Sequence, residues 1–189
     1  PTLAGLPVAA EIRQVVEKLG TQLQQAGAVV EEAPLPALDF QQNLTDAGEL
    51  IGMMIGVFQP EAEANPTTLA NYLTALHERD QAIIAWEKFF AQWDLLLCPP
   101  AMTNAFPHCE SGAPLMVDGN AMPYWLVNAH TTLFNYSGHP AVVLPFTLSQ
   151  YGLPIGVQIV GKRWDEERLL AAAKIISEVT GGFQRPPSC

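Results

Sequence analysis

The chain has 189 residues, of which 49% are apolar and 15% are charged. This composition excludes an intrinsically disordered chain, because such chains are poor in apolar residues and rich in charge. The longest apolar run, residues 50–58, is less than half of the roughly 20 residues that a membrane-spanning helix needs. The net charge is −10 and lysine and arginine do not cluster, which argues against nucleic acid and anionic membranes as partners.

The N-terminal segment predicts a helix followed by a strand. Apolar residues recur three and four positions apart over residues 8–26, a spacing typical of one helix face. Gly27 is a natural end for this helix, because glycine tolerates the left-handed conformation found there. Residues 28–32 read Ala-Val-Val-Glu-Glu and predict a short strand, which Pro34 closes.

Two further helices and a strand are expected before residue 100. Asp39 is suited to cap a helix that ends near residue 58, since its carboxylate can accept bonds from free amide groups. Asn65 and Pro66 open a long third helix that runs to about residue 90, with proline in a first-turn position. The apolar run over residues 94–98 predicts a strand that is buried on both faces.

The second half predicts a long loop, a helix and a pair of strands. Residues 101–120 are rich in proline, glycine, asparagine and histidine and are expected to form a loop. Helical spacing continues over residues 123–136. The apolar runs 141–146 and 155–160 predict two strands joined by a turn that contains Gly152.

A last helix completes the predicted fold. Asp165 is suited to cap it, and it is expected to reach about residue 180. Its inward positions are expected to be Leu169, Leu170, Ala173, Ile176 and Val179. Helices interleaved with short apolar strands indicate a single α/β domain over residues 1–189.

Ser137, His130 and His139 are the residues that invite a search for catalytic chemistry. A serine nucleophile needs a base within hydrogen-bond reach and oxyanion donors nearby. Residues as close in sequence as Ser137 and His139 rarely point the right way, and the surroundings do not match the Gly-x-Ser-x-Gly turn. We therefore favour a loop hydroxyl for Ser137, a structural or pocket-wall role for His139 and a core position for His130.

The remaining reactive side chains also favour structural roles. Three cysteines are too few for a disulfide framework in a chain of this length, and Cys98 lies in an apolar run typical of the core. His108 and Cys109 have no second pair at metal-ligand spacing, so we expect neither a metal nor a cofactor. The charged run 77–80 is expected to be a solvated helix face. Because no signal-like segment opens the chain, the expected location is the cytoplasm.

Five motifs of the chain form a connected set. They are Phe-Asn-Tyr-Ser-Gly-His-Pro-Ala within residues 134–146, Gly-Leu-Pro-Ile-Gly-Val-Gln-Ile-Val-Gly over 152–161, Glu-Glu-x-Leu-Leu-x-Ala-Ala over 166–173, Asp-Leu-Leu-Leu-Cys-Pro-Pro over 94–100 and Gly-Ala-Val-Val-Glu-Glu-Ala-Pro over 27–34. In combination they resemble the C-terminal part of amidase signature family enzymes, and the match extends over nearly the whole chain.

The resemblance implies an amidase signature fold, with a mixed sheet layered against helices, and a parent enzyme that hydrolyses carboxylic amides. That family uses a Ser–cis-Ser–Lys triad in a Gly/Ser-rich half that precedes the matched segment. Neither Lys18 nor Lys88 has such a tract nearby. The chain is therefore expected to be the C-terminal half of an amidase without its catalytic N-terminal half. It is expected to hold no catalytic residue of its own and to be inactive alone.

The resemblance also implies which residues contact the substrate. In the family, the helix before the Phe-Asn-x-x-Gly-x-Pro-Ala turn walls the acyl pocket. Trp125, Asn128 and Thr132 share one face of this helix, and Leu133 and Asn135 continue toward the turn. These five are the expected substrate-binding residues, and a purely structural role in the core is the alternative for Trp125 and Leu133.

The expected partners are the N-terminal half of the amidase, a small-molecule amide and a second copy of the chain. A second copy is expected because the charge-poor stretch 89–161 would expose apolar area without its cover. Two rival functions stay open. One is a fragment of the A component of glutamyl-tRNA amidotransferase, although residues 50–65 lack the arginines that this component carries there. The other is a non-catalytic module for assembly or small-molecule binding.

Overall fold

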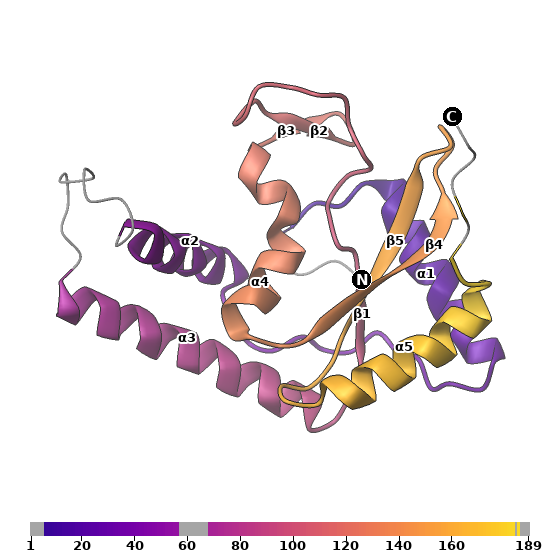
Figure 1. Cartoon of the computed structure of the whole chain (residues 1–189), viewed down its shortest axis with the longest axis horizontal. Coiled ribbons are helices and arrows are strands. Elements are labelled where there is room, and N and C mark those ends of the chain that lie inside the picture. The colour runs from indigo at the N-terminus through magenta and orange to yellow at the C-terminus, as the bar shows by residue number, and fades with distance from the viewer. Residues whose placement is uncertain (1–5, 57–67, 184, 186–189) are drawn as a thin grey trace.

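The computed structural model describes residues 6–56, 68–183 and 185, and it is built from helices around a small sheet (Figure 1). The α-helices are α1 (Ala10–Gln25), α2 (Phe40–Gly56), α3 (Leu69–Phe90), α4 (Ala129–Ser137) and α5 (Glu166–Thr180), with a 3-10 helix η1 (Tyr124–Asn128) before α4. The strands are β1 (Leu96–Cys98), β2 (Leu115–Val117), β3 (Asn120–Met122), β4 (Ala141–Leu148) and β5 (Pro154–Val160). No helix among the described residues is long and apolar enough to cross a membrane.

The main sheet has the strand order β1–β5–β4, and all of its pairs are antiparallel in the described part of the chain, where a mixed sheet was expected. β4 and β5 form the predicted hairpin. Their register is interrupted between Pro145 and Thr147, and Pro145 is tolerated because β4 is an edge strand. One face of the sheet packs against α1 and α5 through Val157 and Ile159 of β5.

A second core lies on α3 and α4. Its centre is Trp86, whose ring lies 5.0 Å from Phe134 and 5.5 Å from Phe89, centroid to centroid. Phe40 and Phe90 lie farther out, at 6.0 and 6.1 Å. α2 packs along α3, and together they extend as an arm to one side of the sheet (Figure 1). This core fixes α4, which carries part of the candidate site.

The local signals for helix ends are confirmed where the structure describes them. The Asp39 carboxylate accepts a bond from the backbone N–H of Gln42 at 3.0 Å, as expected of a helix cap. Gly181 ends α5 in the left-handed conformation, with φ 89°. Asp165 precedes α5 as predicted, but its side chain makes no capping bond. Asn65 and Pro66 lie outside the described residues, and α3 is capped by Thr68.

Three predictions in the strand and loop regions are wrong. Residues 28–32 form no strand: Val29 is 83% exposed, and the Val30 carbonyl accepts a bond from the side chain of Gln24. A β-prone run becomes a strand only beside an available edge, and here it lies against α1 instead. β1 forms as predicted but is buried only at Cys98, because it lies at the edge of the sheet.

The third error is the predicted loop 101–120, which contains the hairpin β2–β3. Asp118 and Gly119 at its tip have φ of 47° and 81°, as a two-residue hairpin turn requires. An Asp-Gly pair between two short apolar runs was the signal for it. On α5, Leu170 is 59% exposed rather than inward, because Leu169 takes the place against the sheet.

Asp118 also caps α1 from a distance, and we expect its loss to weaken the fold. Its carboxylate oxygens accept the backbone N–H of Ala10 at 2.9 and 3.2 Å, in the first turn of the helix. Asp118→Ala is expected to lower the free energy of unfolding by about 1–2 kcal/mol, measured by urea denaturation. Asp118→Asn keeps an acceptor and tolerates a positive φ, so its loss should be smaller. Equal stability of both variants and the unchanged chain would contradict the capping role.

Candidate functional site

Four of the five predicted substrate-binding residues lie in the open on η1 and α4. Trp125 is 75% exposed, Asn128 and Asn135 are exposed, and Thr132 is half-buried. The Thr132 hydroxyl donates to the Asn128 carbonyl at 3.1 Å, which fixes its side chain along the helix. Leu133 is 1% exposed and packs in the core around Trp86, so it can support this surface only from behind.

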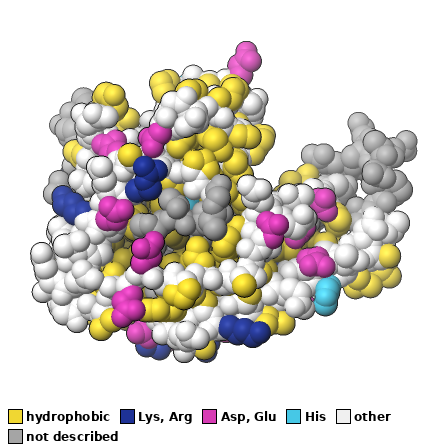
Figure 2. Space-filling view, turned by 180° about the vertical axis from the view of Figure 1, so that it is seen from behind, with side chains coloured by type: hydrophobic (Ala, Val, Ile, Leu, Met, Phe, Trp, Pro, Cys, Tyr) yellow, Lys and Arg dark blue, Asp and Glu magenta, His cyan; other side chains and the backbone are white. Residues whose placement is uncertain are grey.

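Aromatic side chains extend the surface around Trp125. The Tyr124 ring meets Trp125 edge to face, with centroids 5.0 Å apart, and meets Phe106 at 6.3 Å. Phe106 and Met116 are exposed. Figure 2 shows hydrophobic side chains gathered on the upper lobe, where Figure 1 places β2 and β3. The stripe of Trp125, Asn128, Thr132 and Asn135 lines neither of the two cavities found among the described residues, and it forms open surface.

Ser137 and His139 do meet, contrary to the sequence-based expectation. The Ser137 Oγ lies 2.9 Å from Nδ1 of His139, and Nε2 of the same ring lies 3.5 Å from Oε1 of Glu87. Gly138 makes this possible, since its φ of 71° turns the chain back at the end of α4. The order hydroxyl, imidazole, carboxylate matches that of a nucleophile and its base.

Burial nevertheless prevents these groups from acting on a substrate. Ser137 is 1% exposed, and the His139 ring stacks on Phe90 at 5.2 Å. Burial and the nearby charge of Arg163 lower the pKa of His139 to about 4, so its ring is neutral at pH 7. Neither described cavity reaches Ser137. The contact therefore orders the turn between α4 and β4.

His130 and Cys98 are core residues, as the sequence favours. His130 is fully buried on α4, and burial lowers its pKa to about 4. Burial raises the pKa of the Cys98 thiol to about 12, against the opposing effect of the Gln158 amide 3.2 Å from its sulfur. A thiol in that state is neither a nucleophile nor a metal ligand at neutral pH. Among the described residues, no three His, Cys, Asp or Glu side chains gather as a metal site would require.

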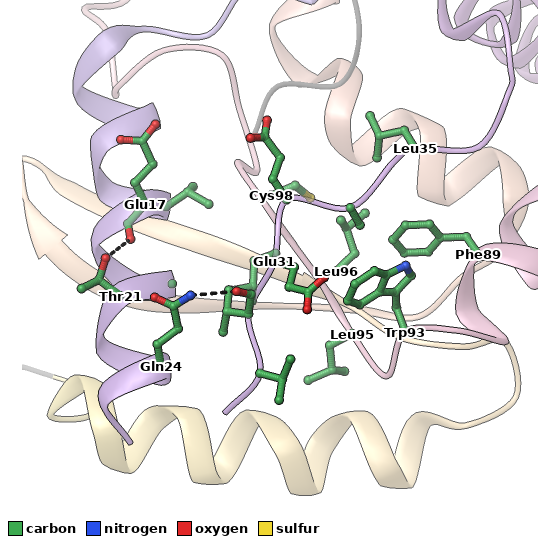
Figure 3. Close-up of a pocket in the computed structure, with 17 residues that line it drawn as sticks. Glu17, Thr21, Gln24, Glu31, Leu35, Phe89, Trp93, Leu95, Leu96 and Cys98 are labelled. Carbon is green, nitrogen blue, oxygen red and sulfur yellow. Dashed lines mark hydrogen bonds between the residues drawn. The ribbon is translucent and has the colours of Figure 1, made fainter. Parts of the chain in front are cut away.

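A cavity of about 550 Å³ lies between α1, residues 29–35 and β1 (Figure 3). Its inner wall is apolar and includes Phe89, Trp93 and Leu96, while Glu17 and Glu31 stand at its rim. No sequence motif predicts this cavity, because its walls come from three separate segments. A second hollow lies beyond it, between residues 34–38 and α3.

The profile of the Amidase family matches residues 45–170, so the chain belongs to the amidase family. Among curated proteins it is similar to the glutamyl-tRNA(Gln) amidotransferase A component of Brevibacillus brevis, with 34% identity over 118 residues, 62% of this chain and 23% of the relative. The corresponding protein of Cereibacter sphaeroides is 32% identical over 100 residues, 53% of this chain and 19% of the relative. The chain thus spans less than half the length of these relatives.

Solved structures confirm the expected α/β amidase signature fold. A 6-aminohexanoate cyclic dimer hydrolase superposes with a TM-score of 0.72 at 23% identity, over 96% of this chain and 44% of that one. A bacterial aryl acylamidase gives a TM-score of 0.69 at 22% identity, over 92% and 41%. The glutamyl-tRNA(Gln) amidotransferase A component of Thermotoga maritima gives 0.68 at 24% identity, over 90% and 39%.

Proposed function

We propose that this chain is the substrate-pocket portion of a serine amidase that hydrolyses carboxylic amides to an acid plus ammonia or an amine. The observation that carries the proposal is the match of the Amidase family over residues 45–170. The nucleophile and its Ser–cis-Ser–Lys partners belong, in this proposal, to the part of the parent polypeptide outside these 189 residues. The burial of Ser137 supports this division, because a buried hydroxyl cannot reach an amide carbonyl.

In the parent enzyme the stripe on η1 and α4 would form one wall of the acyl pocket. Trp125 offers a broad apolar face, and Asn128 and Asn135 offer amide donors and acceptors at the edge of that face. The serine would attack the amide carbonyl, the amine would leave with a proton, and water would hydrolyse the resulting ester. The stripe would act by orienting the acyl group during both steps.

We expect the 189-residue chain alone to hydrolyse no amide above the uncatalysed rate. The same chain joined to the rest of its polypeptide is expected to turn over members of a panel of aliphatic, aromatic and amino-acid amides. Release of ammonia or amine measures both. Hydrolysis by the purified chain alone would refute the division of labour, and an inactive parent would refute the proposed reaction.

We expect Trp125→Ala in the active parent to raise KM for aryl amides about 10- to 100-fold, the amount expected when a large apolar contact is lost. Acetamide, which is too small to reach the ring, should be hydrolysed nearly as before. Trp164→Ala is the matched control, since Trp164 is also exposed but lies in the turn before α5. Equal effects of the two variants would contradict a role for Trp125 in the pocket.

A second candidate function is that of the A component of a glutamyl-tRNA amidotransferase, which the names of the curated relatives favour. The absence of arginine from residues 50–65 favours a neutral or apolar substrate instead. Release of ammonia from glutamine, compared with its release from propionamide, separates the two. Strong preference for glutamine would support the second function.

A further inference from the structure

We propose that the cavity beside β1 is a docking groove for an extended, basic segment of the parent amidase, which adds to the free edge of β1 as a strand. The proposal rests on the proposed function in one respect, because it requires a parent polypeptide longer than these residues. It concerns the assembly of the enzyme and assigns no role in catalysis to the groove.

The first support is the edge of β1. This strand pairs with β5 from Leu96 opposite Val160 to Cys98 opposite Gln158, and no other described strand pairs with it. A free strand edge presents backbone N–H and C=O groups that an added strand can satisfy. The chain segment nearest to this edge does not do so, because Val30 is bonded to Gln24 of α1.

The second support is the chemistry of the cavity. Phe89, Trp93 and Leu96 form apolar wall on one side, and the rim carries the carboxylates of Glu17, Glu31 and Glu32 (Figure 3). No lysine or arginine is among the described residues that line it. Successive side chains of a strand point to opposite faces. A strand that alternates apolar and basic residues would therefore place one set on the apolar wall and the other beside the carboxylates.

The third support concerns the source of the segment. The chain covers 44% of the 6-aminohexanoate cyclic dimer hydrolase it resembles, so a polypeptide of that length has ample chain left to supply a strand. A second copy is the poorer occupant, since each copy carries 19 acidic and 9 basic residues and would bring a net charge of −10 to an acidic rim. Charge complementarity therefore favours a basic segment of the parent.

Hydrogen exchange in the intact parent tests the proposal. The amides of residues 95–98 are expected to exchange at least about tenfold faster in the Glu31→Lys/Glu32→Lys variant than in the unchanged parent, because reversed charge repels the basic strand. The matched control is Glu49→Lys/Glu178→Lys, which makes the same charge change on α2 and α5, outside the groove. It should leave this exchange unchanged.

Three outcomes would overturn the proposal. They are equal exchange in all three proteins, an equal effect of the control, and protection of residues 95–98 in the 189-residue chain that grows with its concentration, which would indicate a second copy. The readout does not depend on turnover. A parent that protects β1 but hydrolyses no amide would remove the proposed function and leave the docking groove standing, and an active parent with an unprotected β1 would do the reverse.

Discussion

Stability of the chain is expected to fall as the pH drops from about 6.5 to about 4, because two histidines are buried in their neutral form. Burial lowers the pKa of His130 from 6.5 to about 4, and burial together with Arg163 does the same for His139. Between these values the unfolded chain binds more protons than the folded one, so protonation favours unfolding. The contribution is complete above about pH 6.5 and lost below about pH 4, and it amounts to roughly 3 kcal/mol per histidine.

His130 offers the sharper of the two tests. Neither nitrogen of its ring has a hydrogen-bond partner among the described residues, whereas the His139 ring contacts Ser137 and lies near Glu87. His130→Leu should remove about half of the difference in unfolding free energy between about pH 7.5 and about pH 4.5, measured by urea denaturation. His77→Leu, at an exposed position on α3, is the matched control. An unchanged pH profile in His130→Leu would show that this ring is not buried in the folded chain.

The elements predicted well are those whose causes are local. α1 follows from apolar residues at helical spacing, and five of these, Ile12, Val15, Val16, Leu19 and Leu23, are buried. The cap of α2 at Asp39 and the hairpin of β4 and β5 also depend on neighbours in the sequence. Residues 28–32 have the composition of a strand, but a strand needs an edge to pair with, and composition cannot supply one.

The candidate site was predictable in part for the same reason. Helical spacing alone places Trp125, Asn128 and Thr132 on one face, and their exposure agrees with that spacing. The contact of Ser137 with His139 depends on the backbone of Gly138, which a rule about neighbouring residues cannot anticipate. The acidic cavity depends on the packing of three segments and was beyond reach of any motif.

Trp86→Ala is expected to lower the free energy of unfolding by about 3–5 kcal/mol, the usual cost of removing a large aromatic side chain from a core. Trp86 is 1% exposed, and its ring contacts Phe134 of α4 at 5.0 Å and Phe89 of its own helix at 5.5 Å, centroid to centroid. The lost side chain would leave a cavity between α3 and α4 that rigid aromatic neighbours cannot close. Urea denaturation at about pH 7.5 measures the loss, because both buried histidines are neutral there.

Two variants show whether the loss arises from packing in this core. Trp86→Phe keeps much of the apolar volume and should lose less than half as much stability, whereas Trp125→Ala, at an exposed position, should change it by no more than about 0.5 kcal/mol. A loss below about 1 kcal/mol for Trp86→Ala would contradict the packing described for α4. Because Trp86 holds the helix that carries Asn135 and Thr132, Trp86→Ala should also weaken the parent's binding of every amide alike. Trp125→Ala should affect only those amides whose acyl group reaches its ring.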